Sequence, residues 1–396
     1  MPKKTIEDID VKGKRVLLRV DFNVPLDVNT GAISDDSRIQ ASLPTIKYLI
    51  DHKSRIILCS HLGRPKGNVV ENLRMAPIAQ RLSQLMDVPL STAADCIGQE
   101  VERKVETLKE GDILVLENLR FHPEEEANDA DFARKLASLA DIYVNDAFGT
   151  AHRAHASTVG VAKYLPAVAG FLMKKELEMM EKLLHDSGRP SACLIGGAKV
   201  SDKIELLQNM LRKVDTLLVG GGMAATFLKT QGYEVGRSLI ENDKLGLARK
   251  LPQEAEEWKV QFLLPIDVVV AEEIKAGAPT RIVPTTDIPS GSHIVDIGPQ
   301  SIELFCSELK KCRTITWNGP MGIYEIPQFA QGTKSIASFL STLNATTIIG
   351  GGSSAEVVQE MGLTDKMTHV STGGGASLRF LEGVALPGVE ILLDKE

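Results

Sequence analysis

Short apolar, β-branched runs alternate along this chain with longer stretches of helical periodicity, and this alternation limits the possible folds more than any other feature. In the first half the apolar runs are Val16–Val20, Arg55–Ser60, Ile113–Leu116 and Ile142–Asn145. The helical stretches between them are Arg38–Asp51, where Pro44 predicts a kink or a later start, Met75–Met86 and Ala130–Ala140. Strands that alternate with helices form parallel sheets covered by helices on both faces. We therefore expect an α/β fold built from doubly wound parallel sheets.

The same alternation resumes after residue 190. The expected strands there are Ala192–Ile195, Thr216–Val219, Phe262–Leu264, Val268–Ala271, Ile294–Ile297, Thr314–Trp317, Thr346–Ile349 and His369–Ser371. A chain of 396 residues exceeds what one hydrophobic core usually serves, which favours two domains. Near the midpoint, 172–185 reads as a long amphipathic helix, which we interpret as the connector; a surface helix of one domain is the alternative. We expect an N-terminal domain at 1–171 and a C-terminal domain at 186–375.

Composition excludes several classes of protein. The formal net charge is -7, whereas a nucleic-acid-binding chain usually has a basic face. Five cysteines without a CxxC pair indicate reduced thiols and a cytoplasmic protein. The first ten residues are charged, which argues against a secretory signal, and no apolar run approaches the ~18 residues that span a bilayer. We expect neither a nucleic-acid nor a membrane partner.

Cationic side chains follow the expected strands of the first half. His61 and Arg64 follow the second strand, Arg120 the third and Arg153 the fourth, while Arg38 begins the first helix. Ligands of open parallel sheets bind beyond the carboxyl ends of the strands. Guanidinium groups bind phosphate or carboxylate through two parallel hydrogen bonds. The set therefore predicts a site for a multiply charged anion.

Glycine clusters follow the expected strands of the second half. They are Gly196-Gly197, Gly220–Gly222, Gly350–Gly352 and Gly373–Gly375, and Lys199 and Lys203 lie just after the first. Glycine allows close approach of the backbone to a ligand, and helix N-termini direct free N–H groups at phosphates. The clusters predict a nucleotide site. No GxxxxGK[ST], HEXXH or GxSxG motif occurs, which argues against a Walker-type nucleotide hydrolase, a zinc protease and an α/β-hydrolase.

Several long motifs together resemble the phosphoglycerate kinase family. They are DFNVP at 21–25, HLGRPKG at 61–67, ENLRF at 117–121, NDAFGTAHRAH at 145–155, GGAKVSDK at 196–203, NGPMG at 318–322 and STGGG at 371–375. The resemblance implies phosphoryl transfer between 1,3-bisphosphoglycerate and ADP, giving 3-phosphoglycerate and ATP. It also implies Mg²⁺, direct in-line transfer, and a usually monomeric protein. It further implies two domains that face a cleft, with 376–396 packing back onto the N-terminal domain. Because direct transfer needs the reacting atoms ~3 Å apart, we expect the domains to close during transfer.

The resemblance also assigns site residues by position. The triose substrate would contact Asp21, Phe22, Asn23, Arg38, His61, Leu62, Gly63, Arg64, Arg120 and Arg153. The catalytic pair would be Arg38 and Lys199, which contact the phosphoryl group in transfer. The nucleotide would contact Lys203, Gly220, Gly221, Gly222, Asn318, Pro320, Glu325, Gly351, Gly352, Ser353 and Ser354.

One position departs from the family. Most members carry an aspartate that helps hold Mg²⁺ where this chain has Ser353, so the metal ligand is open: waters and phosphate oxygens, or another carboxylate, would complete the shell. Two other functions stay open at this point. The chain can be an acyl-phosphate kinase for another carboxylate, or a catalytically inactive binding protein of the same fold. The direction of physiological flux is open as well.

Overall fold

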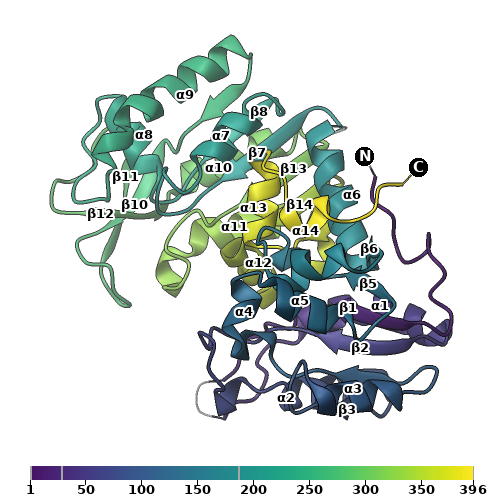
Figure 1. The fold of residues 1–396 in the computed structure, drawn as a ribbon. Coiled ribbons are helices and arrows are strands. Elements are labelled where there is room, and N and C mark those ends of the chain that lie inside the picture. Colours follow the sequence, from purple (N-terminus) through teal and green to yellow (C-terminus); the bar gives the residue numbers. More distant parts are fainter. Residues whose placement is uncertain (1, 28–29, 186–187, 396) are drawn as a thin grey trace. The chain divides into compact units, whose positions relative to one another are not determined.

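The computed structural model describes residues 2–27, 30–185 and 188–395, which form two compact units (Figure 1). The first unit extends to Glu178 and includes the residues from Ala385 onward, and the second extends from Met179 to Val384. The boundary therefore falls inside helix α6 (Phe171–His185). Among the described residues, no helix has the length and apolar character needed to cross a bilayer.

The first unit is a six-stranded parallel sheet in the order β3-β4-β2-β1-β5-β6. Its strands are β1 (Arg15–Arg19), β2 (Arg55–Cys59), β3 (Ser91–Thr92), β4 (Ile113–Val115), β5 (Ile142–Asn145) and β6 (Ala167–Ala169). Its helices are α1 (Ser37–Asp51), α2 (Ala76–Met86), α3 (Gln99–Glu106), α4 (Pro123–Glu126), α5 (Ala130–Ala137) and α14 (Pro387–Glu390), and the π-helical turn η4 covers Ala156–Gly160. Short 3₁₀ turns are η1 (Glu71–Leu73), η2 (Leu119–Phe121), η3 (Phe148–Thr150) and η5 (Val161–Lys163).

Successive residues of β1 after the first are all buried, as expected for a strand in a sheet covered on both faces. Val16 and Leu18 join a buried cluster with Ile39 of α1 and Ile78 of α2. Leu17, which points to the opposite face, is also fully buried. This double burial explains why the strands of the first unit are recognisable as continuous apolar runs.

The second unit contains a second six-stranded parallel sheet, in the order β15-β14-β13-β7-β8-β9. Its strands are β7 (Ser191–Ile195), β8 (Thr216–Val219), β9 (Gln261–Leu263), β13 (Thr314–Asn318), β14 (Thr346–Gly350) and β15 (His369–Val370). The helices of this unit are α7 (Ile204–Met210), α8 (Ala224–Thr230), α9 (Leu245–Glu257), α10 (Pro299–Leu309), α11 (Gln331–Leu340), α12 (Gly352–Glu360) and α13 (Gly375–Leu381). Its 3₁₀ turns are η6 (Asn242–Lys244), η7 (Pro327–Phe329) and η8 (Thr364–Lys366).

A three-stranded antiparallel sheet corrects one expectation. The strands β10 (Asp267–Ala271) and β12 (His293–Ile297) were expected in a parallel sheet, but both pair antiparallel, β10 lying between β11 (Thr280–Pro284) and β12. No helix lies between β10 and β11, so the chain folds directly back on itself. A parallel pair needs a longer crossover connection.

Two boundaries also differ from the sequence expectations. Helix α1 begins at Ser37 and continues through Pro44, so the later start suggested by Pro44 is wrong. The Gln40 carbonyl, which loses its helical partner at Pro44, belongs to an exposed residue. The C-terminal return to the first unit begins at Ala385 rather than at residue 376. Helix α13 stays in the second unit, where the Asn209 side chain donates to the Leu381 carbonyl at 2.5 Å. The last residues pair with the first, since the Lys4 N–H donates to the Leu393 carbonyl at 2.7 Å.

Candidate active site

The strand order of the first unit gathers the predicted anion-binding residues. β4, β2, β1 and β5 are neighbours and all run parallel, so their carboxyl ends meet at one edge of the sheet. Asp21 to Asn23 follow β1, His61 to Arg64 follow β2, Arg120 lies in η2 after β4, and Arg153 follows η3 after β5.

Asp21 binds Arg38, which lies in the first turn of α1. The Arg38 Nη1 lies 2.6 Å from Asp21 Oδ2, and about one third of the Arg38 side chain stays exposed, whereas Asp21 is nearly buried. A charge-assisted bond to a buried carboxylate fixes the guanidinium more firmly than a surface ion pair does. Arg38 is therefore oriented before any substrate binds and still has donors to offer.

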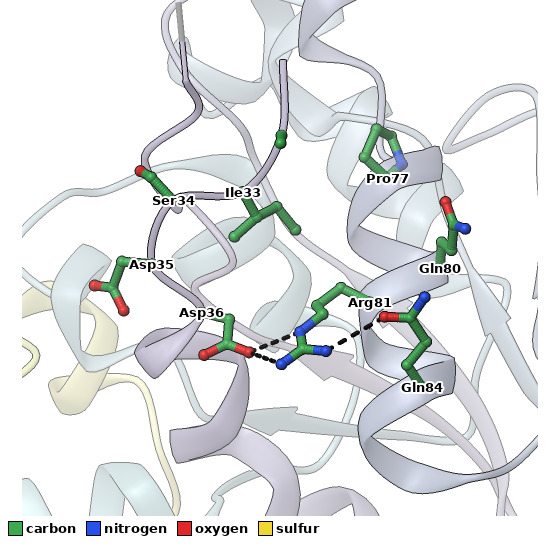
Figure 2. A pocket seen from close by; sticks show the side chains of 9 residues that line it. Ile33, Ser34, Asp35, Asp36, Pro77, Gln80, Arg81 and Gln84 are labelled. Atoms are coloured by element: carbon green, nitrogen blue, oxygen red, sulfur yellow. Dashed lines mark hydrogen bonds and ion pairs between the residues drawn. The ribbon is translucent and has the colours of Figure 1, made fainter. Parts of the chain in front are cut away.

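A second ion pair anchors the start of the same helix (Figure 2). Asp36, at the N-cap position of α1, accepts from Arg81 Nε at 2.7 Å, and Arg81 projects from α2. Although burial opposes it, hydrogen bonds from Gln40 and Arg81 hold the pKa of Asp36 below its ordinary value. The pair borders a polar hollow of about 570 Å³ between the loop 32–36 and α2. It holds in place the helical turn that carries Arg38.

Hydrogen bonds tie the loops after β1, β2 and β4 to one another. The Gly63 N–H donates to Asn23 Oδ1 at 2.8 Å, and Arg120 Nη1 donates to the Gly63 carbonyl at 2.9 Å. The Asn118 side chain accepts from Leu62 N–H at 3.2 Å and donates to its carbonyl at 2.8 Å. Phe22 is fully buried, so its side chain supports the loop while its backbone and neighbours remain near the edge.

The cations at this edge differ in exposure. Arg120 is nearly buried, Arg38 and Arg153 are partly buried, and Arg64 is exposed. Burial, followed by the positive charges of Arg19, Arg120, Arg38 and Arg153, holds the pKa of His61 well below its ordinary value. His61 is therefore neutral near pH 7. The charges that reach its ring show that these arginines act on one region, while Arg64 lies at its exposed margin.

In the second unit the glycines let neighbouring strand ends pack backbone to backbone. A Cβ on Gly196 would lie 2.1 Å from the Pro320 carbonyl oxygen, and one on Gly221 would lie 2.6 Å from the Gly197 nitrogen. The close approach we expected toward a ligand is thus partly an approach of the loops after β7, β8 and β13 to one another.

These loops enclose a cavity of about 440 Å³ within the second unit. Its lining includes Gly197, Gly221, Gly222, Pro320, Glu325 and Ser353. The wall contributed by the antiparallel sheet is largely apolar, with Val268, Ile294 and Val295. A concave, mostly apolar pocket with a few convergent polar groups is the usual form of a small-molecule site. Gly220 lies beside this lining, where a Cβ would come within 2.5 Å of the Met321 sulfur.

The polar end of this region contains a partly buried lysine and a helix N-terminus. Lys203 Nζ donates to Asn318 Oδ1, and burial lowers the pKa of Lys203. Gly351 caps α12 with a φ of +82°, so the N–H groups of Gly352, Ser353 and Ser354 form its first turn. The Ser354 hydroxyl donates to the Gly350 carbonyl at 2.5 Å, which leaves only its backbone N–H for a phosphate. Lys199 is exposed in the loop after β7.

Sequence reasoning missed several residues of this site. Arg19 is fully buried at the end of β1 and contacts His61, and Glu125 and Ser157 are buried beside it. An arginine inside the apolar run RVLLRV was the available signal, because a charge in a buried strand requires partners. Asp296 lines the cavity of the second unit, and burial raises its pKa to about 7.

One cluster has the ligand types of a metal site but not those that Mg²⁺ prefers. Among the described residues, Asp95, Cys96 and His122 bring one ligand atom each within 4.8 Å of the others. His122 Nε2 lies 2.6 Å from Asp95 Oδ1, and this hydrogen bond raises the pKa of His122. Mg²⁺ takes oxygen ligands, so we interpret the cluster as an ion pair beside a buried thiol.

Two α/β units, one with a cationic sheet edge and the other with a glycine-lined cavity, define a class of enzymes that transfer phosphoryl groups. The phosphoglycerate kinase family model matches residues 6–384. The chain is 59% identical over 399 residues to phosphoglycerate kinase of Dictyoglomus turgidum and 58% identical over 395 residues to that of Pelotomaculum thermopropionicum, with 100% of each chain covered. The solved phosphoglycerate kinase of Coxiella burnetii superposes with a TM-score of 0.88 at 40% identity, over 98% of both chains. The chain belongs to the phosphoglycerate kinase family.

The glycine packing in the second unit gives a stability prediction. Gly221 has a φ of +68° and backbone atoms within 3 Å of a would-be Cβ, whereas Gly232, with a φ of +90°, has none within 4 Å. Gly232→Ala should cost only the left-handed strain, about 1 kcal/mol, and Gly221→Ala about 3 kcal/mol because backbone must also shift. Urea unfolding followed by circular dichroism measures both. Equal losses for the two variants would contradict the packing role of Gly221.

Proposed function

We propose that this chain catalyses reversible phosphoryl transfer between 1,3-bisphosphoglycerate and ADP, giving 3-phosphoglycerate and ATP. The observation that carries the proposal is the separation of two complementary sites. Oriented guanidinium groups lie at the carboxyl edge of one parallel sheet, and a glycine-lined cavity lies in the other unit. ATP and ADP are substrates of this reaction, and neither is a resident cofactor.

The roles of the residues follow from charge and position. We assign the triose anion to the edge formed by Asp21, Asn23, Arg38, His61, Arg120 and Arg153, with Arg64 at its exposed margin. Asp21 and Asn23 offer acceptors to a hydroxyl, and the guanidinium groups offer paired donors to phosphate and carboxylate. We assign the nucleotide ring to the cavity beside Gly220–Gly222 and Pro320, the ribose to Glu325, and the phosphates to Lys203 and the first turn of α12.

Neither a general acid nor a general base is needed for this reaction. The leaving group of the acyl phosphate is a carboxylate, and in the reverse direction a carboxylate attacks the γ-phosphorus. The protein therefore acts by positioning and by stabilising the charge that spreads over the equatorial oxygens in the transition state. We propose Arg38 and Lys199 as the groups that contact the phosphoryl group in transfer.

A coupled assay tests the proposal against its alternatives. With 3-phosphoglycerate and MgATP, and with ADP release coupled through pyruvate kinase and lactate dehydrogenase to NADH oxidation, turnover of roughly 10²–10³ s⁻¹ is expected, the upper part of the usual range of enzymes. ADP release reports the phosphorylation of any acid. Acetate and aspartate in place of 3-phosphoglycerate should give no turnover, because neither carries a carboxylate and a phosphate at the two ends of a three-carbon chain. Preference for one of those acids would favour another acyl-phosphate kinase, and no turnover with any acid would favour an inactive binding protein.

The two catalytic cations give the next prediction. Arg38→Ala and Lys199→Ala should each lower kcat by roughly 10²-fold or more with smaller changes in KM, because both act mainly on the transition state. Lys250→Ala, which removes an exposed lysine from α9, is the matched control and should leave both constants unchanged. A Lys199→Ala enzyme with normal kcat and only a raised KM would remove Lys199 from the transfer step.

Direct transfer also requires the reacting oxygens to come within ~3 Å of the same phosphorus. Because the proposed sites belong to different units, we propose that the units close during the reaction, with bending near α6. The radius of gyration from small-angle scattering should fall when both ligands are bound. An unchanged radius with both ligands demonstrably bound would contradict closure.

Mg²⁺, which the family implies, would be held beside the first turn of α12 and would offset negative charge on the nucleotide phosphates. Ser353 occupies the position of the family aspartate and lines the cavity at the first turn of α12. A hydroxyl is a weaker partner for Mg²⁺ than a carboxylate. Ser353→Asp should therefore lower the free Mg²⁺ needed for half-maximal rate, whereas Ser353→Ala should not. Titrations of MgCl₂ at fixed nucleotide test this, and superimposable curves for the wild type and Ser353→Asp would contradict it.

We further propose a monomeric, cytoplasmic enzyme without nucleic-acid or membrane partners. The support is chemical: within the described part of the chain all five cysteines are free, and burial raises the pKa of the Cys59 thiol to about 12. Such thiols suit a reducing compartment and take no part in the transfer. Light scattering after size exclusion measures the molar mass, which should be that of one chain. The mass of a dimer would contradict that part of the proposal.

A further inference from the structure

A buried chain of hydrogen bonds connects a carboxylate in α4 to the histidine of the anion site. Glu125, fully buried, accepts from the Ser157 N–H at 2.9 Å and from the Ser157 hydroxyl at 2.6 Å. Because that hydroxyl gives its single proton to Glu125, it acts as the acceptor for Arg19 Nε at 2.9 Å. The Arg19 Nη2 lies 3.1 Å from His61 Nδ1.

The direction of the hydrogen bond between Arg19 and His61 decides which ring nitrogen of His61 carries a proton. A guanidinium has five donors, no acceptor, and does not lose its proton in proteins. The Nδ1 atom of His61 must therefore accept, so it carries no proton, and the proton of the neutral ring lies on Nε2. The other reading, an imidazolium paired with Asp21, has a distance of 4.0 Å between Nδ1 and Asp21 Oδ1, which is too long for a hydrogen bond.

The charges around the ring agree with this assignment. Asp21 after β1 faces it with one negative charge, while Arg19, Arg38 of α1, Arg120 of η2 and Arg153 after η3 all act on it as cations. A fifth positive charge on His61 would be repelled by this set. Its neutral form also needs no counter-ion once it is buried.

Ser157 connects the Glu125 carboxylate to the buried Arg19 guanidinium, since it bonds both. The neighbouring His155 does not neutralise this carboxylate, because its Nδ1 lies 3.9 Å from Glu125 Oε1 and burial, with nearby arginines, lowers the pKa of His155 to about 4. The Tyr143 hydroxyl donates to the Ser157 carbonyl at 2.8 Å and fixes the turn that presents the serine. Arg19 is therefore held from one side by Ser157 and from the other by the Val20 carbonyl.

We propose that Arg19, oriented by Glu125 through Ser157, is a positioning residue that fixes His61 as the neutral Nε2–H tautomer. His61 then offers the triose anion a neutral hydrogen-bond donor beside the guanidinium groups, and its contribution to binding does not change between pH 6 and 8. This inference rests on the proposed triose-binding role of His61. The position of the proton on the His61 ring can nevertheless be measured without substrate.

The test is a long-range ¹⁵N–¹H spectrum of the histidine rings of the purified full chain, with the His61 signals assigned by their loss in His61→Gln. The wild type should show the neutral Nε2–H pattern throughout pH 6 to 8. Ser157→Ala removes the acceptor of Arg19, so a second neutral tautomer, with its proton on Nδ1, should appear. The KM for 3-phosphoglycerate should rise roughly threefold to tenfold, the worth of one buried hydrogen bond, with a smaller change in kcat.

Ser54→Ala is the matched control, because Ser54 is also a fully buried serine of the first unit and donates at 2.9 Å to a backbone carbonyl, that of Val11. It should leave the His61 signals and KM unchanged. If Ser157→Ala does not fold, Arg19→Lys is the replacement variant. The lysine ammonium keeps the positive charge, but it lacks the planar group whose separate nitrogens bond Ser157 and His61. An imidazolium or Nδ1–H pattern in the wild type, or unchanged His61 signals in the folded variant, would overturn the proposal. Should the tautomer be as stated while 3-phosphoglycerate leaves the His61 signals unmoved, the triose role of His61 fails and the positioning role of Arg19 stands.

Discussion

The parallel pairing of β1 with β2 on one side and β5 on the other is the constraint on which the first unit depends. In this register Arg19 lies beside Cys59 and Asn145, so the residues that follow each strand emerge at one edge. Asp21, His61 and Arg153 are separated widely along the chain but belong to this single edge. A slip by one residue would turn Arg19 to the other face of the sheet and break its bonds to Ser157 and His61.

The cations gathered at this edge need nearby negative charges, and carboxylates of the same unit supply them. Arg38 has Asp21 at 2.6 Å, Arg120 has Glu126 at 3.2 Å, and Arg19 has Glu125 through Ser157. Each carboxylate orients a guanidinium while leaving donors free on at least Arg38, which remains partly exposed. The edge is thus organised before its ligand arrives, and little rearrangement opposes binding.

The sequence indicated the parallel sheets and the positions of most candidate residues, because doubly buried strands read as apolar runs and polar residues begin where each strand ends. The sequence did not reveal contacts between residues that are far apart along the chain. Arg19 and Ser157 are 138 positions apart, and Arg19 and His61 are 42 apart, so no local pattern joins them. The antiparallel sheet β11-β10-β12 was missed because β11 is mostly exposed and lacks a long apolar run. The glycine clusters were noticed, but their packing against one another depends on strand order, which periodicity does not reveal.

Hydrogen–deuterium exchange measures whether each substrate binds to its own unit. With 3-phosphoglycerate alone, protection should appear in the loops that follow β1, β2, β4 and β5. With ADP alone, it should appear in the glycine loops after β7, β8, β13 and β14. Protection of the glycine loops by 3-phosphoglycerate, or of the arginine-bearing loops by ADP, would contradict the account.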